Sequence, residues 1–384
     1  MERIVFNTGR LRVNSIKARE TLQDALDAGV RWFDHNAQAN DLTWLLANML
    51  PDDARVMVRI GYAKTEPGST TVTGFRRVNE ELSHSLANYV VKANVEGLKL
   101  HLPGKVDRVF LHNPEQLNPS VNKRVMLGSS LQIIRDAGFK AGLSTSEPGK
   151  VQDWLEVDDI AELASVRTPA CAFDGASALK ALDGLATDHP HVEVVAYRPF
   201  LALDGSAPRR LTDLTKNDLG ASGVHDYKAI YARALRYFTP KPEITDEDTI
   251  EGCKTFTDLV SELDSALSGF SSFEEYEYHL GSRIAPMLHS RFTELDEDSA
   301  DLLKDFFEAY GATVRRSTQK ATRALAESTP AVAGVGALRS DERMADWALR
   351  RVLARTNLSK VSIAFEAPSD VVNVARILAG INNN

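Results

Sequence analysis

Cysteine is scarce in this chain, which has only Cys171 and Cys253 among its 384 residues. Two cysteines cannot build a disulfide framework, and neither stands in a spacing typical of a metal site. The sequence also lacks any apolar run long enough to span a bilayer, and its start, MERIVFNTGR, lacks an apolar stretch of signal-peptide length. These absences predict a cytoplasmic protein in a reducing compartment, with no membrane partner and no metal site.

Positive charge is not in excess either. The formal net charge is −8 and the pI is about 5.7, which argues against a nucleic-acid partner. Hydrophobic residues make up 43% of the chain and charged residues 26%. A chain of this composition and length can bury a large core, in one large domain or in two ordinary ones.

Short β-rich runs alternate with stretches of helical periodicity through most of the chain. Such alternation indicates parallel strands with helices outside them. Eight runs qualify as strands: RIVFNTG, VRWFD, RVMVRIG, VDRVFLH, KAGLS, LASVRTPACAF, VEVVAYRPF and SKVSIAF. Eight strands fit a closed (β/α)8 TIM barrel better than an open doubly wound sheet.

One segment, residues 203–335, interrupts this alternation. It contains helical stretches and no convincing strand, and it is too long for a structureless loop. We therefore predict a barrel formed by residues 1–202 and 336–384, with a helical insertion at 203–335 after strand seven. We expect the aromatic residues of the insertion to form its small core, with a cofactor site or a partner surface as the alternative; they are Tyr227, Tyr231, Tyr237, Phe238, Phe270, Phe273, Tyr276 and Tyr278.

Polar residues stand at the ends of several predicted strands. In a barrel of this kind, reactive side chains collect where strands end and loops begin. Asp34, His35 and Asn36 follow one another at the end of the second strand, and the other strand ends carry Arg59, His112, Asn113, Ser144, Tyr197 and Arg198. An acid, two imidazoles, amides and fixed cations suit the binding of an anionic small molecule and proton transfer within it.

Several fragments of the chain form an ordered set: NTGRL, AGVRWFDHNAQAND, LHNPE, AGFKAGLSTS, VVAYRPF and ALRRVL…SKVSIAFEAPSDVVNVA. In their order and spacing these fragments resemble aldo-keto reductases, and the resemblance covers roughly residues 1–202 and 336–384. The resemblance implies a (β/α)8 barrel, in agreement with the alternation of strands and helices. It also implies carbonyl reduction with NADPH.

The resemblance implies a set of catalytic residues, of which this chain keeps only a part. The aspartate of the family matches Asp34, and its substrate-orienting histidine matches His112. The lysine that would pair with the aspartate is Arg59 here, and the tyrosine that would protonate the substrate falls near Ala39. Residues 35–41 contain no tyrosine.

These replacements change the chemistry that the site can perform. A reductase delivers a proton to a developing alkoxide, and alanine has none to give. Arginine stays charged at every accessible pH, so Arg59 cannot replace an adjustable lysine, but it can pair with Asp34 or clamp a carboxylate, sulfate or phosphate. His35 is a candidate replacement acid, because an unperturbed imidazole titrates near pH ~6.5. A purely structural ion pair at Asp34, and a strand-capping role for His112, remain the alternatives.

The segments that would hold the cofactor are altered as well. The resemblance implies that the loop and helix after strand eight hold the adenosine phosphate through a glycine and a basic residue. Ala364 stands near the glycine position, and Glu366 and Asp370 stand where positive charge is wanted. Two carboxylates would repel a 2′-phosphate, and the insertion replaces the clamp loop after strand seven. We therefore predict no cofactor, with NADPH as the disfavoured alternative.

The leading hypothesis is a non-redox small-molecule enzyme, such as a biosynthetic lyase or cyclase, on an aldo-keto reductase-like barrel. Its reaction would be an elimination, a cyclisation or an isomerisation. The predicted catalytic residues are Asp34, His35, Arg59 and His112, and the predicted substrate-binding residues are Asn36, Asn113, Ser144, Tyr197 and Arg198. In this hypothesis His112 or His35 is the general acid or base, Arg59 and Arg198 bind the anion, and Asp34 orients Arg59.

Two alternatives belong to other functional classes. The first is a non-catalytic subunit whose helical insertion binds a partner chain, in which case Arg198 is an anchor for the insertion. The second is an oxidoreductase that uses NADH or NADPH through an altered site.

Overall fold

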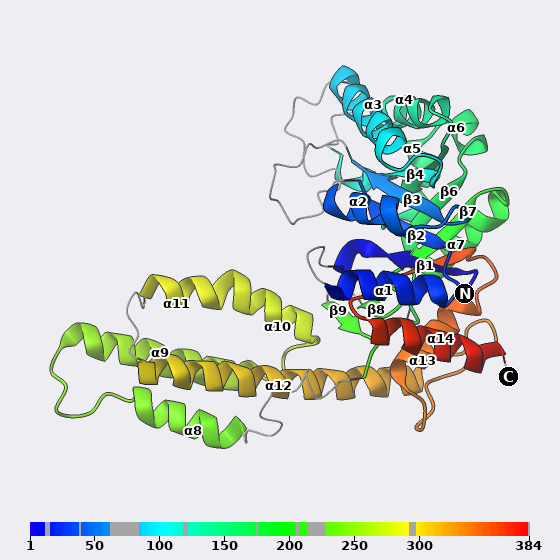
Figure 1. Ribbon diagram of the computed structural model, residues 1–384. Coiled ribbons are helices and arrows are strands. Elements are labelled where there is room, and N and C mark those ends of the chain that lie inside the picture. The colour runs from blue at the N-terminus through cyan, green and yellow to red at the C-terminus, as the bar shows by residue number, and fades with distance from the viewer. Residues whose placement is uncertain are drawn as a thin grey trace. The chain divides into compact units, whose positions relative to one another are not determined.

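The computed structural model describes residues 1–11, 16–37, 40–61, 84–117, 122–173, 176–204, 207–213, 227–291 and 297–382. The chain forms two compact units, each of which is built around its own core (Figure 1). The barrel unit comprises Met1–Pro199, Val332–Val335 and Ala348–Asn384. The helical unit comprises Phe200–Ala331 and Gly336–Trp347. It thus begins before residue 203, where we placed the start of the insertion, and it takes in residues beyond 335.

The barrel unit is a closed barrel of eight parallel strands, which confirms the predicted (β/α)8 fold. Around the barrel the order is β1-β10-β7-β6-β5-β4-β3-β2. All eight predicted strands take part; they are β1 (Ile4–Asn7), β2 (Trp32–Asn36), β3 (Arg55–Ile60), β4 (Val106–His112), β5 (Lys140–Ser144), β6 (Ser165–Pro169), β7 (Glu193–Tyr197) and β10 (Lys360–Ala364).

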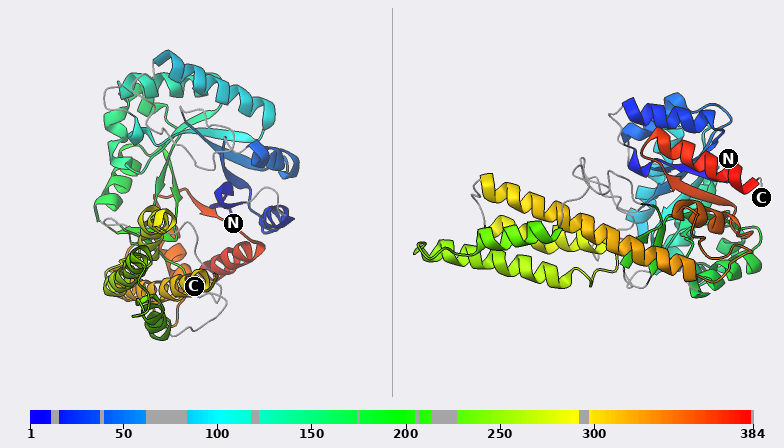
Figure 2. Two further views of the ribbon diagram at one scale, coloured as in Figure 1. Left: turned by 90° about the vertical axis from the view of Figure 1, so that its left-hand side faces the viewer. Right: turned by 90° about the horizontal axis from the view of Figure 1, so that it is seen from below.

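Helices surround these strands on the outside (Figure 2, left). They are α1 (Ile16–Asp27), α2 (Asn40–Met49), α3 (His84–His101), α4 (Lys123–Asp136), α5 (Val151–Trp154), α6 (Val157–Ala161), α7 (Ala176–Asp188), α13 (Met344–Leu353) and α14 (Pro368–Asn382), with short 3₁₀ turns at η1 (Thr8–Arg10), η2 (Pro114–Gln116) and η3 (Pro148–Lys150). Helix α1 shows why they pack this way: Ala18, Leu22 and Ala25 recur on one face, and all three are buried.

Left-handed glycines direct the chain from two of these helices into the next strand. Gly29 follows α1 with φ 86°, and the N–H of Val30 donates to the carbonyl of Ala25 at 2.9 Å. Gly138 follows α4 with φ 87°, and the N–H of Phe139 donates to the carbonyl of Ile134 at 3.2 Å. A single left-handed residue directly after the helix ends it, and glycine adopts this backbone conformation without strain.

Alternation along the strands separates the barrel interior into layers. Side chains two residues apart on a strand share a face. Val5, Met57, Phe110 and Val195 form a buried apolar cluster, with Trp32 packed against it. Two residues further along their strands, toward the C-terminal ends, the same face carries polar side chains. The apolar layer therefore closes the barrel beneath the polar residues of the candidate site.

The helical unit begins with an antiparallel hairpin, β8 (Leu201–Asp204) and β9 (Ala207–Arg210). The expectation that residues 203–335 contain no strand was wrong for this hairpin. Its helices are α8 (Tyr227–Phe238), α9 (Glu247–Ala266), α10 (Phe273–His279), α11 (Ala285–Arg291) and α12 (Glu297–Ser328), with a π-helical turn, η5 (Leu280–Ile284), between α10 and α11. Helices α8, α9 and α12 lie side by side along this unit (Figure 2, right). Among the helices of the described ranges, we find none with the length and apolar character that a membrane crossing requires.

Aromatic side chains form much of the core of the helical unit, as predicted. Tyr227, Phe238 and Tyr276 are buried in one cluster with residues of α9 and α12, and the rings of Tyr231, Phe270 and Phe273 pack against that cluster. The prediction was wrong for Tyr237 and Tyr278, which are 44% and 70% exposed. Both lie on the outer faces of short helices, where the spacing of aromatic residues alone does not reveal which side turns inward.

Candidate functional site

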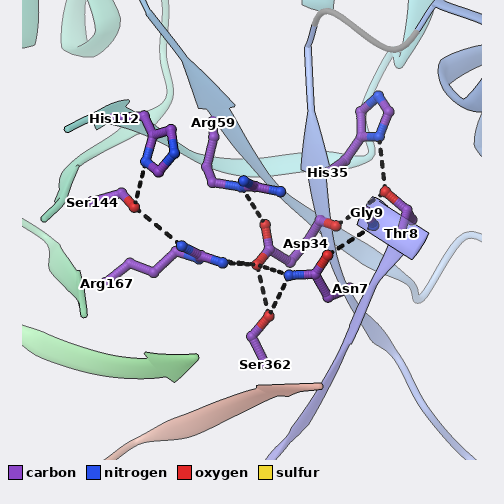
Figure 3. A network of polar contacts seen from close by, with 10 residues as sticks. All are labelled: Asn7, Thr8, Gly9, Asp34, His35, Arg59, His112, Ser144, Arg167 and Ser362. Carbon is purple, nitrogen blue, oxygen red and sulfur yellow. Dashed lines mark hydrogen bonds and ion pairs between the residues drawn. The ribbon is translucent and has the colours of Figure 1, made fainter. Parts of the chain in front are cut away.

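Asp34 is the centre of a polar network at the C-terminal ends of the barrel strands (Figure 3). Its Oδ1 accepts a hydrogen bond from Nε of Arg59 at 2.9 Å. Its Oδ2 accepts from Nε and Nη2 of Arg167 at 2.9 and 2.7 Å. The hydroxyl of Ser362 and the amide of Asn7 also donate to Oδ2, at 2.6 and 3.1 Å. Five donors from four other strands thus converge on one carboxylate.

Asp34 is only 1% exposed, yet it remains ionised. Burial by itself would raise the pKa of Asp34, but the charges of Arg167 and Arg59 and the hydrogen bond from Ser362 outweigh burial and hold this pKa well below its usual range. Asp34 is therefore a permanent anion and not a proton donor. The predicted pairing of Asp34 with Arg59 is confirmed. Together, Asp34 and its two guanidinium partners carry an excess of one positive charge.

Arg167 is the residue that the sequence analysis missed. It lies on β6, its side chain is 2% exposed, and it holds Asp34 through two N–H groups while Nη1 donates to Ser144 Oγ at 3.1 Å. Its guanidinium also lies 4.0 Å above the ring of Tyr197. A signal was present in the sequence, because an arginine in the middle of the apolar run LASVRTPACAF is buried at a cost unless it finds a charged partner.

Arg59 and Arg167 differ in how many of their N–H groups are bound by other side chains of the described residues. Its Nε binds Asp34, and among the described residues the structure gives Arg59 no second hydrogen-bond partner. The two terminal amino groups of Arg59 can therefore donate to a ligand in the barrel mouth, whereas the N–H groups of Arg167 are directed to Asp34 and Ser144.

His112 lies at the end of β4 and joins the network through Ser144. Its Nδ1 lies 2.9 Å from Ser144 Oγ, which in turn accepts from Arg167. The imidazole is partly buried. Burial, and then the positive charges of Arg59 and Arg167, lower the pKa of His112 well below 6.5. His112 is therefore neutral at neutral pH in the free protein.

His35 faces away from the network, which corrects its predicted role as a catalytic acid. Its neighbour Asp34 points into the barrel, so the alternation of the strand turns His35 outward. There Nε2 lies 2.7 Å from Thr43 Oγ1 on α2, and Nδ1 lies 3.3 Å from Thr8 Oγ1 on η1. The ring is fully buried, and burial, with the charge of Arg59, lowers the pKa of His35 to about 3. His35 is an uncharged link between β2, α2 and η1.

The five predicted substrate-binding residues fall into different settings. Ser144 is fully buried and connects His112 to Arg167. Asn36 is on the same face of β2 as Asp34. Asn113 directly follows β4 and has a left-handed φ of 56°. Its backbone N–H donates to the Ser144 carbonyl at 2.7 Å. Tyr197 is buried, which raises its pKa above 10, and Arg167 covers its ring. Its hydroxyl therefore stays protonated near neutral pH.

Arg198 is exposed and has a left-handed φ of 59°. Its guanidinium lies 5.5 Å from the centre of the Tyr197 ring. The second guanidinium that contacts Asp34 is that of Arg167, and anion binding by Arg198 stays a prediction. Ala39, the position that the aldo-keto reductase resemblance assigned to the missing tyrosine, lies outside the described residues.

The carboxylates after β10 already have partners within the chain. Glu366 pairs with Arg10 at 2.7 Å. Asp370 Oδ2 accepts from the N–H groups of Glu366 and Ala367 at 2.8 and 3.0 Å. These N–H groups stand just before α14, where the dipole of a helix favours a negative group. Asp370 supplies that negative charge from the chain itself.

The resemblance to aldo-keto reductases recurs among solved structures. The chain is similar to an aldo-keto reductase from Bacillus halodurans in its holo form, at 12% identity and a TM-score of 0.47, over 98% of this chain and 86% of that one. For the apo form of that protein the values are 11%, 0.43, 97% and 85%. A comparison with protein-family models gave no match, and a comparison with curated protein sequences gave none. The barrel assignment rests on the strand order of this chain.

Replacement of Arg167 by methionine should destabilise the barrel strongly. Asp34 would lose two of its hydrogen bonds and one of its two cations while it stayed buried. Loss of one partner from a buried ion pair costs about 3–5 kcal/mol. Urea unfolding followed by tryptophan fluorescence measures this loss, and three of the four tryptophans (Trp32, Trp44 and Trp154) belong to the barrel unit. The matched control is Arg10→Met, which removes an exposed pair with Glu366 and should cost less than about 1 kcal/mol. Equal losses in the two variants would contradict the central position of Arg167 in the network.

Replacement of His35 by glutamine should flatten the loss of stability at acid pH. The folded-state pKa of His35 is about 3, whereas an unfolded histidine titrates near ~6.5, so between these values the unfolded chain binds more protons. The contribution of neutral His35 is complete above pH ~6.5 and is lost as the pH falls toward about 3, by up to ~1.4 kcal/mol per pH unit. The wild-type and His35→Gln free energies of unfolding, measured from pH ~4 to ~8, should therefore converge toward the acid end. Parallel curves would show that His35 does not titrate this way.

Proposed function

We propose that the barrel mouth binds a small organic anion and transfers a proton within it, without nicotinamide chemistry. The observation that supports this proposal most directly is the charge of the network. One carboxylate is engaged by two guanidinium groups, which leaves an excess positive charge at the strand ends, and within the described part of the chain the terminal amino groups of Arg59 have no partner. A fixed, excess cation at the strand ends favours a ligand that brings negative charge.

Arg59 would bind a carboxylate or a similar group of the substrate. The guanidinium stays protonated at all relevant pH values, so it can orient and neutralise an anion but cannot exchange protons with it. Asp34 and Arg167 act as positioning residues in this proposal, because Asp34 holds Nε of Arg59 and Arg167 holds Asp34. The aspartate would thus fix the direction in which the terminal amino groups of Arg59 point.

His112 would be the proton-transferring group, and the substrate itself would activate it. In the free protein, burial and the two guanidinium charges keep the pKa of His112 low, which makes it a weak base. An anion beside Arg59 would offset part of that positive charge and so raise the pKa of His112 toward neutrality. Proton transfer would then be favoured only once a substrate of the right charge is bound.

Elimination, cyclisation and isomerisation of a carboxylic acid all fit this arrangement when the reaction begins with removal of a proton next to an electron-withdrawing group. The chain supplies a base, a carboxylate clamp and a rigid frame for both. The carboxylate of Asp370 in the first turn of α14 and the position of Arg167 over the Tyr197 ring give no support to a dinucleotide, since the first brings negative charge and the second covers an aromatic face.

Exchange of carbon-bound protons tests the proton-transfer chemistry without knowledge of the natural substrate. Small 2-oxo and 2-hydroxy acids are incubated with the protein in D₂O, and the loss of their α or β proton signals is followed by NMR. We expect catalysed exchange in at least one of these acids, and a decrease of about 10²-fold or more in His112→Ala and in Arg59→Met. The control Arg124→Met removes an exposed cation on α4 and should leave the rate unchanged. Wild-type rates in both site variants would remove these residues from the mechanism.

Nicotinamide binding is tested by thermal stability. A ligand that binds the folded state stabilises it, by about 2.7 kcal/mol at a hundred times its dissociation constant. NADPH and NADH at millimolar concentration should therefore leave the Tm of the wild-type protein unchanged. A clear rise in Tm with either dinucleotide, reduced or absent in Arg59→Met, would favour the oxidoreductase alternative over the present proposal.

A further inference from the structure

The helical unit contains a pocket of its own, separate from the barrel mouth. It lies between β9, the start of α10 and the middle of α12, and it has a volume of about 50 Å³. One water molecule needs roughly 10–15 Å³ of such space, so the pocket can hold a group the size of a few water molecules. The residues that matter for its chemistry are Arg209, Arg210, Ser272, Glu274, Arg315 and Gln319.

Positive charge in this pocket contrasts with the rest of the helical unit. Residues 200–331 contain 23 acidic and 15 basic residues, which is a net charge of −8, so this segment accounts for the whole net charge of the chain. The pocket nevertheless collects three arginines against one carboxylate, Glu274. An attraction for anions at this place is therefore local and depends on these few side chains.

The three arginines are held in place by different partners. Arg209 Nη1 donates to the carbonyl of Ser271 at 2.6 Å, and Arg210 pairs with Glu274. The guanidinium of Arg315 lies 3.9 Å from the centre of the Phe273 ring. Cations that are fixed before a ligand arrives lose less conformational freedom when they bind it.

Neutral donors complete the lining. Ser272 Oγ accepts the N–H of Glu275 at 3.1 Å, which leaves the hydroxyl proton of this buried serine able to donate. The amide of Gln319 donates to the Thr212 carbonyl at 3.3 Å. The hydroxyls of Thr318 and Thr322, by contrast, donate to carbonyls of their own helix. The pocket is therefore rich in donors, and its one acidic acceptor, Glu274, is already paired.

We propose that this pocket is a binding site for a small oxyanion, of the chemical class of a phosphate group. A phosphate has several acceptor oxygens and, near neutral pH, one to two negative charges, which match a cluster of arginines with an excess charge of two. The site lies within the helical unit and shares no residue with the barrel mouth. It therefore stands or falls independently of the proposed proton-transfer chemistry.

Binding of inorganic phosphate to the full-length protein tests the proposal. Equilibrium dialysis at constant ionic strength should show saturable uptake by the wild type with a dissociation constant below about 10 mM. Arg210→Gln and Arg315→Gln should each weaken this binding at least about tenfold, because each removes a charge-assisted donor. The matched control is Arg316→Gln, an exposed arginine next to Arg315 on α12 that does not line the pocket, and it should bind like the wild type.

Two further variants distinguish phosphate binding in this pocket from binding in the barrel mouth and from a loss of folding. Glu274→Gln removes the competing carboxylate and should strengthen phosphate binding several-fold, a gain that loss of folding cannot imitate. Arg59→Met, which disables the barrel site, should retain the uptake that depends on Arg210. Absence of saturable binding in the wild type, or wild-type affinity in Arg210→Gln and Arg315→Gln, would overturn the proposal. Uptake that disappears in Arg59→Met would assign the phosphate to the barrel and overturn it as well.

Discussion

The barrel mouth is organised by one interaction, the insertion of the Asp34 carboxylate between the guanidinium groups of Arg167 and Arg59. These residues come from β2, β6 and β3, and Ser362 and Asn7 bring β10 and β1 to the same carboxylate. Each contact joins two different strands. A buried group of charges like this is costly to desolvate, and well-packed apolar residues would often stabilise the fold as well or better. Stability alone therefore does not account for this group of charges at the strand ends.

Positive charge gathers in two places in this protein, at the strand ends of the barrel and in the pocket of the helical unit. An apolar layer of Val5, Met57, Phe110 and Val195 closes the barrel beneath the network, so the field of the two guanidinium groups acts in a region of low dielectric. That field is one reason why His112 is neutral in the free protein and why an anion would change its proton affinity. In the helical unit, three arginines gather in a pocket although the unit as a whole is acidic. In both places a small number of fixed cations sets the local charge.

Much of the barrel could be predicted from the sequence, because its strands and helices differ in the period of their apolar residues. The eight strand runs were correct, and so was the pairing of Asp34 with Arg59, since both residues end neighbouring strands. The two-stranded hairpin of the helical unit was missed because LALD and APRR are short and carry no long alternation. Tyr237 and Tyr278 were expected in a core that does not contain them, because aromatic composition does not reveal which face of a helix is covered.

By itself, the sequence determined the fold class, because the periods of apolar residues in strands and helices are local properties. It also placed Arg59 and Ala39 where the aldo-keto reductase resemblance would expect a lysine and a tyrosine. Only the tertiary structure showed that Arg167 is the second cation beside Asp34, that His35 turns outward toward Thr43 while His112 turns inward, and that Arg210 and Arg315 share a pocket. Adjacent residues on a strand face opposite sides, and residues that meet across a closed barrel can be separated by a hundred positions or more. Which side chains meet is therefore decided by strand register and barrel closure, neither of which is visible in a linear pattern.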